Sequence, residues 1–268
     1  MPNNPRAISL NAILAATRAR VAALTGKAKE IARAASAAPP PRQFPAPGAT
    51  VGVIAEVKRR SPSQGAIRED LDPVVHAAAY ERGGAAAVSV LTDEAHFGGS
   101  LEDLRRVAAA VGVPALRKDF VIDAVQIPEA RAAGASAVLL IARIVSAQEL
   151  RALAAIVREW DMVPLIEVHA EPELDAALAA GPGVLGVNAR DLDTFAVDLA
   201  AAERLIHRVP AGIAVVGESG VETRADVERL AAAGADFVLV GTSVARKDDP
   251  EKAVRNLVGV KREMGARS

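Results

Sequence analysis

Apolar and polar positions along the chain alternate in blocks of two kinds. Short apolar or β-branched runs end in a polar residue, and each run is followed by an alanine-rich stretch with helical spacing. Several stretches end at a similar joint, in which Gly84, Gly134 or Gly234 stands just before the next apolar run. Because glycine adopts the left-handed conformation that ends a helix, the pattern predicts a helix before each joint and a strand after it. Strands and helices that alternate in this way form parallel βαβ units.

Eight apolar runs are candidates for strands. They cover residues 51–57, 85–91, 113–118, 135–141, 162–167, 183–188, 213–217 and 236–241. Eight successive units favour an α/β fold of the (β/α)8 TIM-barrel type, in which the parallel sheet closes on itself. A doubly wound open sheet is the alternative. Such sheets usually have fewer strands, and no Gly-x-Gly-x-x-Gly dinucleotide motif follows the first run.

The segment before the first predicted strand has a different pattern. Leu10 and Ile13 begin a series of apolar positions with helical spacing, and Ser9 is placed to cap its start. The spacing predicts one helix over residues 9–36. Residues 38–48 contain five prolines, so they are predicted to form a linker rather than a helix or a central strand.

The chain is therefore expected to consist of an N-terminal helical extension with a Pro-rich linker, residues 1–48, and a (β/α)8-barrel catalytic domain, residues 49–268. The whole would form a single domain. A length of 268 residues, of which 51% are hydrophobic, is ordinary for one barrel with a sizeable core.

Composition excludes several classes of protein. The net charge of −1 gives no reason to expect a nucleic-acid or membrane partner recognised by charge. The absence of cysteine excludes disulfides, thiolate metal sites and cysteine catalysis. No apolar stretch reaches the roughly 18 residues that a membrane-spanning helix needs, and the N-terminus lacks the apolar core of a signal peptide. We therefore expect a soluble, cytoplasmic protein.

Charged and amide side chains stand where several predicted strands end. These candidates for catalysis are Glu56, Lys58, Lys118, Glu167, Asn188 and Glu218. In a barrel the carboxyl ends of the strands form the active-site face. Side chains two apart on a strand point the same way, so Glu56 is expected to share a face with Lys58, and Asn188 with Arg190. A solvated rim is the alternative, but charged groups that converge on one mouth are costly to desolvate and favour a function.

Two glycine-containing turns are candidates for a phosphate site. Ser219 and Gly220 follow the seventh predicted strand. Gly241 and Thr242 follow the eighth. Barrels often bind phosphate with these two loops and a helix N-terminus, although plain helix capping would explain the same residues. Ser61, in the loop after the first strand, is a third candidate contact.

The remaining candidates lie in loops. Phe97 and Phe120, after the second and third predicted strands, are placed to flank an aromatic substrate, with core packing as the alternative. Arg59 and Arg60 are expected to be solvated. His169 stands beside a carboxylate, two residues past the fifth predicted strand, but no further ligand has suggestive spacing. We therefore expect no metal site.

Eight short segments, in order along most of the chain, share a likeness to one family. They are residues 54–63 (IAEVKRRSPS), 67–70 (IRED), 89–94 (SVLTDE), 116–120 (LRKDF), 165–169 (LIEVH), 186–192 (GVNARDL), 217–220 (GESG) and 240–243 (VGTS). Together they resemble the indole-3-glycerol-phosphate synthases. The predicted helix over residues 9–36 resembles the family's N-terminal extension, which helps to cover the barrel mouth.

The resemblance implies a carboxy-lyase of tryptophan biosynthesis. Its substrate would be 1-(2-carboxyphenylamino)-1-deoxyribulose 5-phosphate, a small phosphorylated molecule. Ring closure, decarboxylation and dehydration would convert it to indole-3-glycerol phosphate without a cofactor or metal. No nucleic acid or membrane would take part, and the chain would be a monomer or a weak homodimer.

The resemblance also implies roles for single residues. Lys118 would be the acid that protonates the ketone of the substrate. Lys58 and Glu56 would be the acid and base of the later loss of water. Glu167 would be a further catalytic carboxylate and Asn188 would orient substrate groups. The residues that would hold the substrate, its phosphate or its ring, or orient a lysine, are Ser61, Phe97, Phe120, Arg190, Glu218, Ser219, Gly220, Gly241 and Thr242.

Two other functions are possible alternatives, and one loop of the chain differs from the family pattern. Phosphoribosylanthranilate isomerases have a cysteine base at the end of the first strand, where this chain has Glu56 and no cysteine at all. A non-catalytic relative that keeps only the phosphate site would be expected to have lost some of the catalytic positions, all of which are present. Ala124 and Val125 stand where the family often has Pro-Tyr, and Pro128 where an aromatic or polar residue is common. The third loop is therefore expected to differ in shape.

Overall fold

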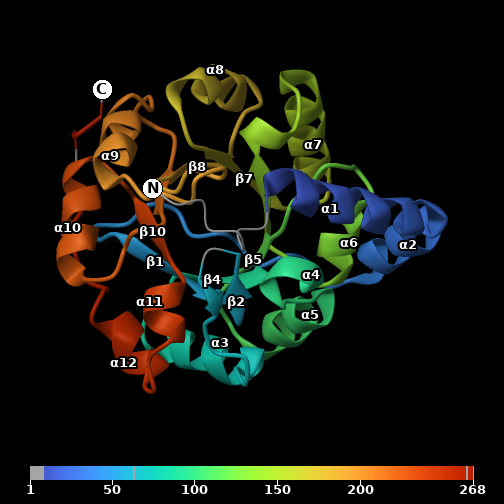
Figure 1. Cartoon of the computed structure of the whole chain (residues 1–268), viewed down its shortest axis with the longest axis horizontal. Coiled ribbons are helices and arrows are strands. Elements are labelled where there is room, and N and C mark those ends of the chain that lie inside the picture. The colour runs from blue at the N-terminus through green and yellow to red at the C-terminus, as the bar shows by residue number, and fades with distance from the viewer. Residues whose placement is uncertain (1–8, 63, 264, 268) are drawn as a thin grey trace.

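The computed structural model describes residues 9–62, 64–263 and 265–267. Eight parallel strands close into a barrel in the order β1-β10-β9-β8-β7-β6-β5-β4, with helices around them (Figure 1). The strands are β1 (Gly52–Val57), β4 (Ala87–Leu91), β5 (Ala115–Lys118), β6 (Ala137–Ile141), β7 (Val163–Val168), β8 (Val184–Asn188), β9 (Val215–Glu218) and β10 (Phe237–Val240). The predicted (β/α)8 barrel is confirmed, and every strand boundary lies within two residues of its predicted position.

The period of two along each strand separates the barrel interior from the layer under the helices. On β1, Val53 and Ala55 belong to the cluster between strands and helices, whereas Ile54 belongs to the cluster inside the barrel. Glu56 follows the parity of Ile54 and lines the mouth together with Lys58. The prediction that Glu56 and Lys58 share a face is therefore confirmed.

Helices and short elements connect the strands. The helices of the outer ring are α3 (Pro73–Arg82), α5 (Leu101–Ala110), α6 (Gln126–Ala132), α7 (Ala147–Glu159), α8 (Glu171–Ala179), α9 (Leu199–His207), α10 (Arg224–Ala232) and α12 (Pro250–Arg255). The short elements at the strand ends are the hairpin β2 (Arg60–Ser61) and β3 (Gly65–Ala66), α4 (Glu94–Phe97), η1 (Ala142–Ile144) and α11 (Thr242–Ala245). Gly84, Gly134 and Gly234 have positive φ angles of 95°, 86° and 100°, as their predicted role in ending helices requires.

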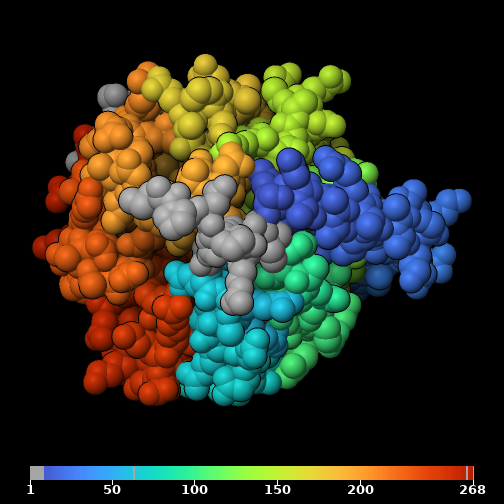
Figure 2. Space-filling view, viewed as in Figure 1, coloured from blue at the N-terminus to red at the C-terminus, as the bar shows by residue number. Residues whose placement is uncertain are grey.

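The N-terminal extension contains two helices, so the prediction of one helix was wrong. They are α1 (Leu10–Thr25) and α2 (Ala28–Ala37), separated by Gly26 and Lys27. Glycine weakens the helix at the break. The two halves also pack on different surfaces, because α2 contacts α6 while α1 supplies Leu10 and Ile13 to the barrel mouth. Figure 2 shows α1 on the near face and α2 projecting beyond the ring. Residues 1–8 of the predicted extension lie outside the described residues.

The Pro-rich segment, residues 38–48, has no regular secondary structure but is fixed to the barrel. Phe44 is 7% exposed, and its ring centroid lies 6.1 Å from that of Phe237, the first residue of β10. Arg42 donates a hydrogen bond of 2.8 Å to the carbonyl oxygen of Ala108. The segment thus covers the amino-terminal end of the barrel, opposite the mouth.

No helix in the described ranges is long and apolar enough to cross a membrane.

Candidate active site

A cavity of about 460 Å³ opens at the carboxyl ends of the barrel strands. All fourteen candidate residues from the sequence line it. They are Glu56, Lys58, Ser61, Phe97, Lys118, Phe120, Glu167, Asn188, Arg190, Glu218, Ser219, Gly220, Gly241 and Thr242. The barrel therefore gathers into one space polar and aromatic groups that are spread over most of the sequence.

Lys118, at the end of β5, lies between two buried carboxyl groups. Its Nζ is 3.1 Å from Glu167 Oε2 and 3.3 Å from Glu218 Oε2. Each of these glutamate side chains is 1% exposed. Gly186 makes room for the second of them, because a Cβ at this position would overlap Glu218 Oε1. One ammonium group thus faces two carboxyl groups away from water.

The two carboxyl groups differ in protonation as a result. Burial raises the pKa of Glu218 to about 8, an effect that Lys118 opposes and Glu167 reinforces. Burial also disfavours ionisation of Glu167, but Lys118 and His169 hold its pKa below the ordinary value. Burial would lower the pKa of Lys118, yet the neighbouring glutamates raise it above the ordinary value. The site therefore holds a cationic lysine between two carboxyl groups, of which Glu218 is protonated more readily than Glu167.

His169 lies behind Glu167, on the loop after β7. Its Nε2 is 3.2 Å from Glu167 Oε1, and its Nδ1 is 3.5 Å from Glu173 Oε2. Burial would lower the pKa of His169, but contacts with both carboxylates raise it to about 9. The imidazolium thus connects the cavity to α8. Across the described residues there is no group of three or more side chains able to hold a metal ion.

A second lysine–carboxylate pair stands at the carboxyl end of β1. Lys58 Nζ lies 2.7 Å from Glu56 Oε1, and the two side chains are 16% and 3% exposed. Gly241 packs against this pair, since a Cβ there would overlap Glu56 Oε1 and lie 2.9 Å from Lys58 Nζ. An acid and a base are therefore held in contact beside the turn after β10.

Asn188 is the last residue of β8, and Arg190 lies two residues beyond it. The Asn188 side-chain oxygen accepts a hydrogen bond of 3.0 Å from the backbone N–H of Arg190. The Arg190 guanidinium donates at 3.0 Å to the carbonyl oxygen of Phe195. Burial lowers the pKa of Arg190, which Glu56 partly offsets. The pair supplies an oriented amide and a cation to the wall of the cavity.

The candidate phosphate turns include left-handed backbone and the start of a short helix. Ser219 and Gly220 have consecutive positive φ angles of 65° and 76°. Gly241 precedes α11, whose first-turn N–H groups have no partner within the helix. Consecutive left-handed residues and helix starts both present backbone N–H groups to an anion. Ser61 lines the same cavity from the loop after β1.

Much of the remaining wall is apolar. The rings of Phe97 and Phe120 lie 6.1 Å apart with an angle of 39° between their planes. The lining residues that were not among these candidates are Leu10, Ile13, Pro62, Gln64, Leu91, Asp93, Asp119, Leu139, Ile141, Leu192, Phe195, Val197, Val221, Glu222, Leu239, Val240 and Ser243. The only sequence signal for Val197 is an apolar residue in a loop, where it is 41% exposed.

Arg59 and Arg60 are not solvated side chains, and that expectation was wrong. Arg59 forms an ion pair with Asp103, at 2.5 Å, and donates at 2.8 Å to the carbonyl oxygen of Gly98. Arg60 donates at 2.9 Å to the carbonyl oxygen of Glu94. Both arginines therefore brace the loop after β1 against the loop after β4.

Such a mouth places the chain among the (β/α)8-barrel enzymes that carry out acid–base chemistry at the ends of their strands. Comparison with known families narrows this class. The family model described as indole-3-glycerol phosphate synthase matches residues 10–257. The chain belongs to the indole-3-glycerol phosphate synthase family, as the resemblance of its motifs suggested.

Individual members of the family are similar in sequence to this chain along nearly their whole length. The chain is 47% identical over 260 residues to indole-3-glycerol phosphate synthase 2 of Streptomyces coelicolor, covering 93% of this chain and 100% of that protein. It is 48% identical over 258 residues to the indole-3-glycerol phosphate synthase of Mycobacterium avium, covering 93% of each.

Solved structures at low sequence identity share the fold. Thiamine phosphate pyrophosphorylase from Pyrococcus furiosus matches with a TM-score of 0.58 at 18% identity, over 77% of this chain and 93% of that one. A mandelate oxidase variant with benzaldehyde matches with a TM-score of 0.58 at 16% identity, over 82% of this chain and 76% of that one. These matches concern the barrel alone.

Proposed function

We propose that this chain catalyses the reaction for which its family is named, as a carboxy-lyase of tryptophan biosynthesis. It converts 1-(2-carboxyphenylamino)-1-deoxyribulose 5-phosphate to indole-3-glycerol phosphate, carbon dioxide and water. The observation that supports this most strongly is the contact of Lys118 with Glu167 and Glu218 inside a cavity that also holds the Lys58–Glu56 pair.

The first step is ring closure. The ring carbon that bears the carboxylate bonds to the ketone carbon, and the ketone oxygen becomes a hydroxyl group. Lys118 suits the supply of this proton, because its buried carboxylate neighbours keep it cationic and fixed in place. Carbon dioxide then leaves, and its bonding electron pair restores the aromatic ring.

The second step is loss of water. An acid must protonate the departing hydroxyl group while a base takes a proton from the neighbouring carbon. Lys58 and Glu56 suit these roles, since they lie 2.7 Å apart at the same mouth. We assign Asn188, which lines the cavity, to orienting the hydroxyl groups of the substrate. Glu218, whose pKa is raised by burial, is assigned to donating a hydrogen bond in its protonated form.

Substrate binding divides between the two sides of the cavity. Phosphate is assigned to the turns after β9 and β10 and to the loop after β1. The aromatic ring is assigned to Phe97 and Phe120, whose rings are neighbours. Arg190 is assigned to an anionic group of the substrate. Burial disfavours its unpaired positive charge, and a bound anion would offset this cost. The contacts proposed for phosphate are Ser61, Ser219, Gly220, Gly241 and Thr242.

The proposal also includes the location, the oligomeric state and the cofactor requirement of the enzyme. The enzyme works in the cytoplasm on a small phosphorylated molecule, as a monomer or a weak homodimer. Neither a cofactor nor a metal takes part, because the two lysine–carboxylate sets supply the acids and bases.

The test is product formation by the purified protein, followed by indole fluorescence with and without EDTA. Lys118→Met keeps the length of the side chain and removes the ammonium group, while Lys29→Met changes an exposed lysine on α2. We expect equal product with and without EDTA, none with Lys118→Met, and wild-type rates with Lys29→Met. No product from folded wild-type protein would refute the proposed function.

A further inference from the structure

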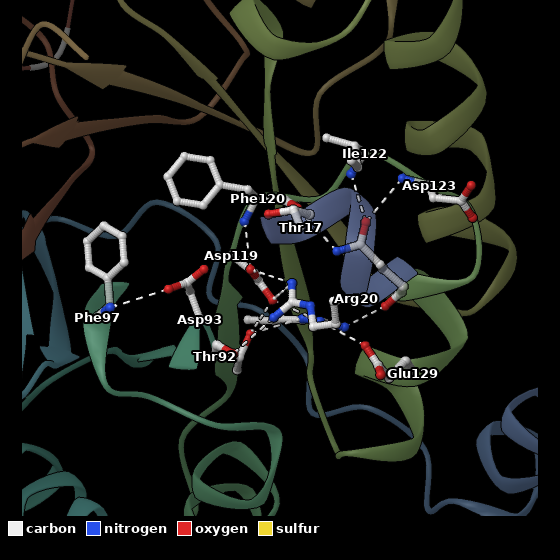
Figure 3. A network of polar contacts seen from close by, with 12 residues as sticks. Thr17, Arg20, Thr92, Asp93, Phe97, Asp119, Phe120, Ile122, Asp123 and Glu129 are labelled. Carbon is white, nitrogen blue, oxygen red and sulfur yellow. Dashed lines mark hydrogen bonds and ion pairs between the residues drawn. The ribbon is translucent and has the colours of Figure 1, made fainter. Parts of the chain in front are cut away.

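A second charged cluster lies between the end of β5 and α1 (Figure 3), and one of its members, Asp119, also lines the cavity. Lys118 points into the mouth, and Arg117, one residue earlier on β5, points the other way because side chains alternate along a strand. Asp119 follows the end of the strand, where it contacts Arg117 and lines the edge of the cavity. Both residues are fully buried, with side chains that are 0% exposed. A buried ion pair needs several partners to offset its desolvation, and one of these partners comes from α1.

The partner from α1 is Arg20. Its Nη2 donates hydrogen bonds of 2.8 Å to both carboxylate oxygens of Asp119. Its Nη1 donates at 3.3 Å to the carbonyl oxygen of Thr92, in the loop after β4. The Arg20 side chain is 29% exposed, so it reaches from the surface of the helix into the protein. One residue of the extension thus binds to the loops after two barrel strands.

The other members of the cluster hold Asp119 in the absence of Arg20. Arg117 Nη2 lies 2.9 Å from Asp119 Oδ2 and 2.9 Å from Glu129 Oε2. Thr92 Oγ1 donates at 2.6 Å to Asp119 Oδ2. Burial disfavours ionisation of Asp119, but the two arginines lower its pKa to about 2. Removing Arg20 therefore leaves the aspartate paired inside the barrel layer and disconnects only the helix.

The cluster is joined to the cavity at two points. Asp119 Oδ1 accepts a hydrogen bond of 2.8 Å from the backbone N–H of Phe120, whose ring lines the cavity. On the helix, Leu10 and Ile13 line the same cavity, and Ile13 belongs to the interior cluster that contains Phe120. Arg20 lies about two turns after Ile13 on the same helix. Its attachment therefore sets how closely these apolar side chains approach the mouth.

We propose that Arg20 is a positioning residue, which fastens α1 over the mouth so that Leu10 and Ile13 complete the apolar wall that holds the aromatic part of the substrate. The inference rests on the proposed function, and it adds a residue outside the cavity to the determinants of substrate binding. Contacts of this wall act on substrate and transition state alike, so their loss raises KM and leaves kcat nearly unchanged.

The experiment compares Arg20→Met with Arg18→Met, which changes an exposed arginine on the same helix. Two quantities are measured: KM and kcat for the carboxyphenylamino-deoxyribulose phosphate, and the amide hydrogen exchange of residues 10–25. Arg20→Met is expected to raise KM roughly tenfold, to change kcat by less than about twofold, and to speed exchange in α1 at least about tenfold. Arg18→Met is expected to match wild type in both, and Arg20→Lys to lie between wild type and Arg20→Met.

Unchanged KM and exchange in Arg20→Met would overturn the inference. A loss of kcat at unchanged KM would also overturn it, since Arg20 would then act on the chemistry and not on binding. If Arg20→Met does not fold, Arg20→Lys decides by the same two measurements. A wild-type protein that forms no product refutes the proposed function, whereas exchange in α1 still reports whether Arg20 holds the helix.

Discussion

The residue that best shows how the interior of the protein controls charge is His169, whose imidazole bridges Glu167 and Glu173. Its folded pKa of about 9 lies above the unfolded value of about 6.5. The stabilisation that it provides is therefore fully present below about pH 6.5 and is lost as the pH rises through about 9.

His169→Gln should remove this pH-dependent stabilisation. We expect the variant to lose about 2 kcal/mol of unfolding free energy at pH 6, and the difference from wild type to shrink as the pH rises to 9. Urea unfolding at a series of pH values measures this. His207→Gln, at an exposed histidine on α9, serves as the control and should stay close to wild type throughout. A difference that is the same at every pH would rule out the charged bridge.

Gly186 tests how tightly Glu218 is placed. A Cβ at this position would overlap Glu218 Oε1 and lie 2.9 Å from Leu165 Cδ2. Because a small displacement of a catalytic group is costly, Gly186→Ala should lower kcat by roughly 100-fold while the barrel still folds. Gly48→Ala, which meets no atom within 4 Å, is the matched control. Steady-state kinetics and circular dichroism of both variants decide, and wild-type kcat in Gly186→Ala would contradict the geometry.

At the scale of elements, the local pattern predicted the strands and missed the break in the N-terminal helix. In the structure Ile54 lies inside the barrel and Val53 outside it, as the period of two along a strand between two layers requires. Residues 10–37 have helical spacing on both sides of Gly26. Gly26 is a local weak point, and α2 in addition packs against α6, a contact between distant segments that no local pattern contains.

The Pro-rich segment gives a prediction about stability. Phe44 is 7% exposed and packs on Phe237 at the end of the barrel opposite the mouth. Phe44→Ala should therefore cost about 3 kcal/mol of unfolding free energy, through lost burial and a cavity, without changing kcat or KM. Val75→Ala, at a side chain that is 63% exposed, is the control. Thermal and urea unfolding measure the effect, and a loss below about 0.5 kcal/mol would mean that the segment is only a linker.

Considered as a whole, the molecule places its charged cavity at the carboxyl ends of the barrel strands, and its Pro-rich segment packs on the opposite end. The charged part of the mouth was predictable from sequence, because polar residues at the carboxyl ends of parallel strands must converge once the sheet closes. The apolar part was not, since Leu10, Ile13 and Val197 reach the cavity from a helix and a loop whose positions depend on long-range packing. Arg20 belongs to the same group, as its partner Asp119 is 99 residues away.

The central claim is that one cavity performs ring closure and dehydration with separate lysines. The most direct measurement follows carbon dioxide release and indole fluorescence together in a single turnover. Wild type should give both in equal amounts, Lys118→Met neither, and Lys58→Met carbon dioxide well ahead of fluorescence. Formation of both products by Lys118→Met at the wild-type rate would contradict the account.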